Sequence, residues 1–195
     1  MTEATSPTPP GDARRVLVLT HTGRDDAREV ALDVVRALTG HGIIVRLLEP
    51  EASDLGLDPG SLAGAVAGSV EVHAAPDADA RGDASVGCEL AIVIGGDGTI
   101  LRAAEITHVS GTPILGVNLG HVGFLAEAEY EDVDTVIDSV VHRRYTSEDR
   151  MTLDVVVYRD GEIVNRTFAV NEASVEKAAR ERMLEVVVEV EPVDE

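Results

Sequence analysis

The residues best suited to chemistry lie in one glycine-rich turn. Residues 92–102 read IVIGGDGTILR, in which Gly95, Gly96 and Gly98 surround Asp97 at the end of an apolar run. Glycines let the backbone approach a ligand closely and aim successive N–H groups at one point, an arrangement that binds anions. A helix is expected directly after the turn, and its positive N-terminal end adds to this attraction. The turn therefore predicts a phosphate site.

Asp97 is unexpected in a phosphate site, because its carboxylate repels phosphate oxygens. Two roles remove this conflict: it binds a metal, or it accepts a proton from a hydroxyl that attacks phosphorus. Phosphoryl transfer to an alcohol needs such an acceptor. The structural alternative is that Asp97 caps the following helix. The three surrounding glycines favour catalysis.

A second glycine loop, GVNLGHVGFL at 116–125, follows the next expected strand. Asn118 and Gly120 end that strand, and the two loops together would line a crevice at the edge of the sheet. The alternative is an ordinary strand-to-helix turn. Phe124 is expected to pack in the core or to form a wall against a flat base.

A third candidate is the pair Asn171-Glu172, which interrupts β-type sequence with two polar side chains that can bind hydroxyls. Taken alone, the pair is more typical of a turn.

The elements that must position these residues alternate between strands and helices up to residue 145, which predicts an open Rossmann-like parallel α/β sheet. In such sheets ligands bind beyond the carboxyl ends of the strands, where the glycine turn lies. Asp25 is a plausible N-cap for the first helix, which two glycines close at 40 and 42. Residues 49–87 are expected to form surface loop around one short strand, VEVH. The other strands are expected at 14–21, 43–48, 89–94 and 112–118, and the later helices at 99–109 and 131–143.

The pattern changes after residue 145 to β-rich, β-sandwich-like sequence. Two runs joined around Asp160-Gly161 predict a hairpin, and 183–191 reads as another strand. We therefore expect a disordered tail at 1–13, an α/β domain at 14–145, and the first strands of an incomplete β-rich domain at 146–195. Three strands are few for an independent domain.

Composition excludes several classes of protein. The 195 residues carry a net charge of -20, which argues against nucleic-acid binding. No apolar run reaches the roughly 18 residues of a membrane span, and the N-terminus lacks the regions of a signal peptide. A cytoplasmic protein is the expectation. The single cysteine allows no internal disulfide, and the six histidines have no metal-ligand spacing, so no metal site is assigned.

Together the three polar stretches resemble the NAD kinase family. GGDGT followed by Leu101-Arg102, then NLGHVGFL, then Asn-Glu ahead of a strand, occur in the family's order, and the HTGR loop after the first strand also fits. The resemblance covers roughly residues 14–191. GGDGT alone is less specific, because diacylglycerol kinase-like enzymes carry a similar motif.

The resemblance implies transfer of a phosphoryl group to the 2′-hydroxyl of the adenosine ribose of NAD, giving NADP. ATP, or inorganic polyphosphate in some members, is the donor, with Mg²⁺ or another divalent metal. NAD kinases are usually homo-oligomers, so a dimer or tetramer is expected. Asp97 then looks like the proton acceptor and the three glycines like the phosphate-contacting turn. The remaining ligand contacts implied are Arg102 on phosphate, Phe124 on adenine, Asn171 and Glu172 on NAD, and Arg182.

Two of these carried-over residues have plain alternatives. Arg102 is equally typical of a solvated helix face, and Arg182 lies in a charged segment that reads as a solvated loop.

The sequence departs from the family at its C-terminus. It ends at EVEPVDE, before a Thr/Gly/Ser-rich segment that completes the dinucleotide site in the family. The expectation is a truncated chain that is inactive, or nearly so, by itself. The alternatives are a lipid-type kinase, or a non-catalytic nucleotide-binding module.

Overall fold

The chain divides into two compact units. The computed structural model describes residues 13–21, 23–57, 69–75, 83–119, 128–129, 133–174, 176 and 187. Unit one is Met1–Glu148 and unit two is Asp149–Glu195.

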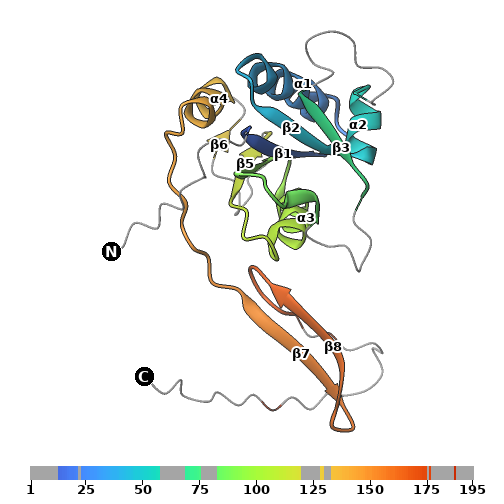
Figure 1. Cartoon of the computed structure of the whole chain (residues 1–195). Coiled ribbons are helices and arrows are strands. Elements are labelled where there is room, and N and C mark those ends of the chain that lie inside the picture. The colour runs from blue at the N-terminus through green and yellow to red at the C-terminus, as the bar shows by residue number, and fades with distance from the viewer. Residues whose placement is uncertain are drawn as a thin grey trace. The chain divides into compact units, whose positions relative to one another are not determined.

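Unit one is built on a six-stranded sheet with the order β3-β2-β1-β4-β5-β6, and every neighbouring pair is parallel (Figure 1). The chain moves outward from β1 to β3, returns to the centre at β4, and then moves outward the other way. The order therefore reverses between β1 and β4, and this switch point is where open α/β sheets bind ligands. The strands are β1 Arg15–Thr20, β2 Ile44–Leu48, β3 Val70–His73, β4 Leu90–Ile94, β5 Ile114–Asn118 and β6 Ala128–Glu129.

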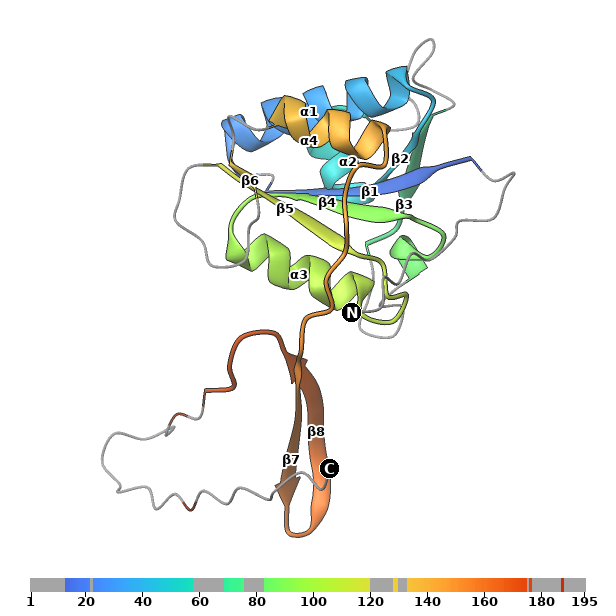
Figure 2. The same ribbon diagram turned by 90° about the vertical axis from the view of Figure 1, so that its left-hand side faces the viewer.

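Helices cover both faces of the sheet. Figure 2 shows α1 (Asp25–Gly40), α2 (Glu49–Leu55) and α4 (Val133–Val141) on one face, and α3 (Asp97–Thr107) on the other. A short 3₁₀ turn, η2, spans Asp83–Ser85. Right-handed crossovers explain why α1 and α3 lie on opposite faces, because they connect strands that advance in opposite directions.

The core consists of two apolar layers separated by the sheet. Successive strand residues point to opposite faces. Val16 and Val18 of β1 therefore pack in the layer beneath α1, whereas Leu17 and Leu19 pack with the apolar side chains of α3. All four are fully buried, which is why the central strands read as continuous apolar runs.

The structure confirms the predicted α/β fold and corrects several details. The first helix begins at Asp25, with Arg24 as its N-cap residue and no side-chain cap bond, so the predicted Asp25 cap is wrong by one position. The helix after the glycine turn begins at Asp97, two residues earlier than expected.

The segment expected to be loop contains a helix, α2. It carries a proline in its first turn and ends at Leu55, and its C-cap residue Gly56 has a left-handed φ of 68° that suits glycine. Sequence periodicity missed it because it has only seven residues and its buried face includes a charged side chain, Glu51.

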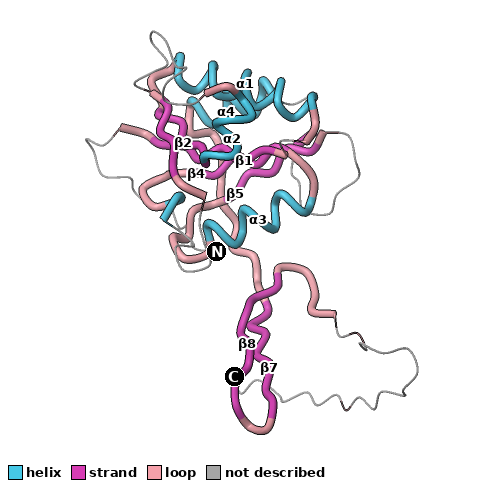
Figure 3. The backbone as a smooth tube through the Cα atoms, turned by 90° about the vertical axis from the view of Figure 1, so that its right-hand side faces the viewer, coloured by secondary structure: helices cyan, strands magenta, loops and turns pink. Residues whose placement is uncertain are grey.

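In unit two, β7 (Leu153–Arg159) and β8 (Glu162–Ala169) form an antiparallel hairpin (Figure 3). Asp160 and Gly161 form its turn with φ values of 54° and 83°, the positive values that a two-residue hairpin turn requires. Of the expected strand at 183–191, only residue 187 is described, and it has no strand assignment. Among the described helices, none has both the length and the apolar character needed to cross a membrane.

Candidate active site

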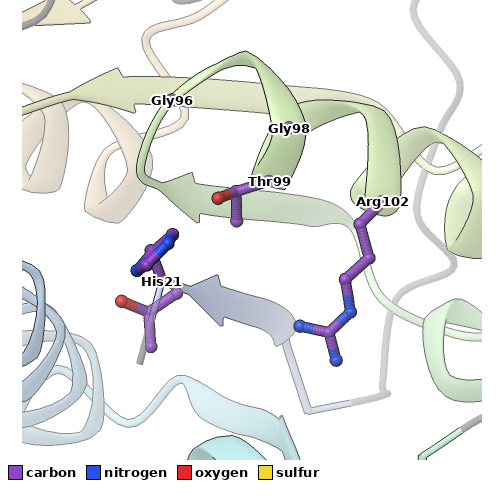
Figure 4. Close-up of a pocket in the computed structure, with 6 residues that line it drawn as sticks. His21, Gly96, Gly98, Thr99 and Arg102 are labelled. Atoms are coloured by element: carbon purple, nitrogen blue, oxygen red, sulfur yellow. The ribbon is translucent and has the colours of Figure 1, made fainter. Parts of the chain in front are cut away.

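A cleft lies at the switch point of the sheet, beyond the carboxyl ends of β1 and β4. Its volume is about 520 Å³. Figure 4 shows side chains from the end of β1 and from α3 arranged around one space. The lining residues are Thr20, His21, Gly96, Gly98, Thr99 and Arg102.

Backbone hydrogen bonds fix the turn that enters α3. The N–H of His21 donates to the carbonyl of Ile94 at 3.0 Å, and the N–H of Gly95 donates to the carbonyl of Val117 at 3.0 Å. These bonds hold the turn between the ends of β1 and β5. Among the described residues, no acceptor is found for the N–H groups of Gly96 and Gly98. Both lie where a helix N-terminus leaves donors for a ligand.

The three glycines of the turn differ in what surrounds them. Gly95 has φ of 155°, and a Cβ there would lie 2.6 Å from Thr99 Oγ1, so the fold itself requires glycine. Within the part of the chain that the structure describes, a Cβ at Gly96 or Gly98 would meet nothing within 4 Å. The open space beside these two glycines lies in the cleft and leaves the backbone accessible to a ligand.

Asp97 is the first residue of α3, between the two glycines that line the cleft, and it is half-buried. It is not the N-cap residue, which is Gly96, and the N–H of Thr99 donates to the Gly96 carbonyl at 2.9 Å. The capping alternative for Asp97 is therefore not what the structure shows. A carboxylate in the first turn still interacts favourably with the positive helix end.

Arg102 lies further along α3 and lines the same cleft. Its Nη1 donates to Glu51 Oε1 of α2 at 2.5 Å. The plain solvated-face alternative therefore does not describe Arg102, which is tied to a buried partner. Sequence reasoning missed Glu51 because nothing in a short polar segment marks a glutamate as buried.

Sequence reasoning also missed Thr20 and His21 as cleft residues. The signal that would have found them is their place at the carboxyl end of the first strand, beside β4. In the loop that follows, Arg24 Nη2 donates to the carbonyl of Leu119 at 3.1 Å and joins this loop to the end of β5. Arg24 also binds Asp26 and thereby lowers the pKa of that carboxyl group.

The remaining predicted ligand residues fall in three groups. Asn118 is the half-buried last residue of β5, the strand next to β4. Asn171 and Glu172 follow β8 in unit two and are exposed. Gly120, Phe124 and Arg182 lie outside the described residues. Within the described part of the chain, no cluster of three or more His, Cys, Asp or Glu side chains could hold a resident metal ion.

Comparison with known proteins identifies the fold. The crystal structure of yeast NADH kinase complexed with NADH superposes with a TM-score of 0.64 at 20% sequence identity, over 83% of this chain and 48% of that one.

Sequence comparison identifies relatives. NAD kinase 2 of Streptomyces coelicolor is 52% identical over 178 residues, which cover 91% of this chain and 55% of that protein. NAD kinase of Mycobacterium tuberculosis is 49% identical over 189 residues, covering 91% of this chain and 57% of its own length. The chain thus spans a little over half the length of these curated relatives. Residues 16–145 match the model of the ATP-NAD kinase N-terminal domain, and the chain therefore belongs to the NAD kinase family.

Proposed function

We propose that this chain forms the phosphate-binding and catalytic part of an NAD kinase, which transfers a phosphoryl group to the 2′-hydroxyl of the adenosine ribose of NAD to give NADP. ATP, or inorganic polyphosphate, is the donor. The observation that carries this proposal is the open space beside Gly96 and Gly98, next to Asp97 and at the switch point of the sheet. Among the described residues, nothing lies within 4 Å of a Cβ built at either glycine. A phosphate group suits this space.

In the proposed reaction Asp97 accepts the proton of the 2′-hydroxyl. The ribose oxygen forms a bond to the γ-phosphorus of ATP, the bond between that phosphorus and the bridging oxygen breaks, and the electron pair leaves with ADP. Backbone N–H groups at Gly96 and Gly98 hold phosphate oxygens, and Arg102 neutralises part of their charge. The local donors are needed because the net charge of -20 repels an anionic ligand.

The divalent metal belongs to the substrate in this proposal. Mg²⁺ enters bound to the ATP phosphates, which are among its usual ligands in phosphoryl-transfer enzymes.

The other assignments are part of the same proposal. Residues 14–145 form the α/β domain and 146–195 begin the β-rich NAD-binding domain of a cytoplasmic homo-oligomer. The further residues assigned to cofactor binding are Asn118, Gly120, Phe124, Asn171, Glu172 and Arg182.

The test is NADP formation from NAD and MgATP. It is measured on the 195-residue chain and on a chimera that continues it with the C-terminal remainder of Streptomyces coelicolor NAD kinase 2. We expect NADP from the chimera and little or none from the chain alone. Asp97→Asn in the chimera should lower the rate by about 10²- to 10⁴-fold, the contribution of a general base.

The matched control is Asp33→Asn, which removes an exposed carboxylate on α1 that pairs with Arg36. It should keep the wild-type rate. A folded chimera that phosphorylates a lipid alcohol and not NAD would favour the lipid-type kinase. An Asp97→Asn chimera with full activity would exclude Asp97 as the proton acceptor.

A further inference from the structure

An ion pair between a buried glutamate and a partly exposed arginine lies at the rim of the cleft. Glu51 of α2 is completely buried, and its Oε1 accepts a hydrogen bond from Arg102 Nη1 at 2.5 Å. Its second oxygen, Oε2, is also buried and has no hydrogen-bond partner in the described part of the chain. Buried carboxylate oxygens are normally paired, so this one requires an explanation.

The pair joins two layers of the fold. Ala52 and Leu55 of α2 pack in the layer beneath α1, whereas Ile100 and Ala103 of α3 pack in the layer on the other side of the sheet. Glu51 follows the carboxyl end of β2 by three residues. Arg102 therefore meets Glu51 beyond the end of the strands, at the edge where the cleft opens.

Burial makes the pairing persistent. If Arg102 left Glu51 to follow a ligand, a carboxylate would remain in the interior without a counter-charge, which is strongly destabilising. Arg102, by contrast, is still 42% exposed at its side chain, and the bond to Glu51 uses one of the five N–H donors of its guanidinium. The arginine can keep its bond to Glu51 and still donate toward the cleft.

We infer that Glu51 is a positioning residue, which orders the Arg102 side chain so that its remaining N–H groups face a phosphate group in the cleft. This inference rests on the proposed function for the class of ligand. An arginine that is already held loses less side-chain entropy when an anion binds. Glu51 thus strengthens anion binding even though it is itself negative. If Glu51 acted only through its own negative charge, it would weaken anion binding.

The experiment is a double-mutant cycle on binding of inorganic tripolyphosphate to the 195-residue chain, measured by calorimetry. The variants are Glu51→Gln, Arg102→Gln and the double variant. We expect Glu51→Gln to weaken binding by about 3- to 10-fold, the effect of ordering one long side chain. In the Arg102→Gln background the same change should alter the affinity by less than about twofold, because Glu51 acts only through Arg102.

The matched control is Glu29→Gln, which removes one negative charge from an exposed position on α1 and should leave the affinity unchanged. Tighter or unchanged binding by Glu51→Gln would overturn the inference, and so would an equal loss in the Arg102→Gln background. Absence of tripolyphosphate binding by the wild-type chain would overturn it as well.

A second measurement applies to the wild-type chain and does not depend on how well Glu51→Gln folds. The Nε–H resonance of Arg102, assigned by its loss in Arg102→Gln, should show a restricted side chain both without and with tripolyphosphate. A side chain that is mobile without the anion would contradict positioning by Glu51. Binding of tripolyphosphate needs neither NAD nor proton transfer. A failure of the positioning inference can therefore be distinguished from a failure of the chimera to form NADP.

Discussion

At the scale of single residues, the glycines of the turn differ in whether the fold itself requires them. Gly95 has a backbone conformation that side chains rarely adopt, and Thr99 occupies the place of its missing Cβ. Gly96 and Gly98 have neither constraint. Gly98 lies inside α3, where glycine is less favourable than alanine, so the chain gives up stability at a position beside the cleft.

This contrast predicts opposite effects of two alanine substitutions. Gly95→Ala should destabilise the protein by about 1–3 kcal/mol, because of the strained φ and the contact with Thr99. Gly98→Ala should stabilise it by about 0.4–1 kcal/mol and weaken tripolyphosphate binding, because the new methyl group fills the space of the ligand. Urea unfolding measures the stability of both variants, and calorimetry measures the affinity of Gly98→Ala for tripolyphosphate. Unchanged tripolyphosphate affinity in Gly98→Ala would mean that phosphate does not bind at the turn.

At the scale of elements, Arg14 fastens α4 to the sheet. Its Nη1 and Nη2 donate to the carbonyls of Val141 and Val140 at 2.7 and 2.6 Å, the last carbonyls of α4. Its Nε donates to Glu89, just before β4, at 3.0 Å, and this bond raises the pKa of Arg14. The Arg14 side chain therefore donates to the last carbonyls of α4 and joins the end of this helix to the starts of β1 and β4.

Replacing Arg14 should therefore loosen α4. Arg14→Met is expected to lower the free energy of unfolding by about 2–3 kcal/mol, since it removes the charged hydrogen bonds to the Val140 and Val141 carbonyls and to Glu89. The control is Arg36→Met, which breaks an exposed pair with Asp33 and should cost less than about 0.5 kcal/mol. Both are measured by urea unfolding. Equal effects of the two substitutions would show that Arg14 does not fasten α4.

Glu71 of β3 predicts a pH dependence at the other edge of the sheet. Burial raises its pKa, but hydrogen bonds from Arg46 and Arg15 outweigh burial and lower it below the ordinary value of 4.5. Because the pKa of the folded state is below that of the unfolded state, these bonds stabilise the fold above about pH 4.5. The stabilisation is lost as pH falls through the folded-state pKa.

Glu71→Gln should therefore be less stable than the wild type at pH 7, by about 1–2 kcal/mol, and the difference should shrink as the pH falls below 4.5. Urea unfolding of both proteins across this pH range measures it. Asp33→Asn, which affects only an exposed pair, should show no comparable change. A difference that grows toward low pH would contradict the sign of the shift.

At the scale of the whole molecule, charge is the dominant property. The chain has 36 acidic and 16 basic side chains, and its net charge of -20 makes the folded state repel itself. Buried pairs such as Arg46–Glu71 are screened by salt much less than this surface repulsion. Added salt should therefore stabilise the protein.

Raising NaCl from 20 to 200 mM should increase the melting temperature by about 2–4 °C, which corresponds to roughly 1 kcal/mol for a chain of this size. KCl at the same concentrations is the control for an effect specific to sodium, and it should act equally. A melting temperature that falls with added salt would mean that exposed ion pairs stabilise the protein by more than the repulsion between its negative charges destabilises it.

Local patterns determined much of the fold. The buried strands were predictable because both faces of a parallel sheet need apolar side chains, and the hairpin because Asp160-Gly161 accepts positive φ at adjacent residues. The glycine turn could be singled out as a candidate phosphate site for the same reason: backbone conformation and N–H geometry are local properties. The helix α2 was not, because its buried face contains Glu51.

Tertiary structure decided what depends on residues distant in sequence. Only the fold shows that Thr99 occupies the space beside Gly95, that Thr20 and His21 join the glycine turn in one cleft, and that Arg102 is held by a glutamate 51 positions earlier. Sequence by itself determined which residues are candidates for chemistry, since residue type sets what an atom can donate or accept. The structure decided their partners, because burial and distance arise only when β1, β2 and β4 lie side by side.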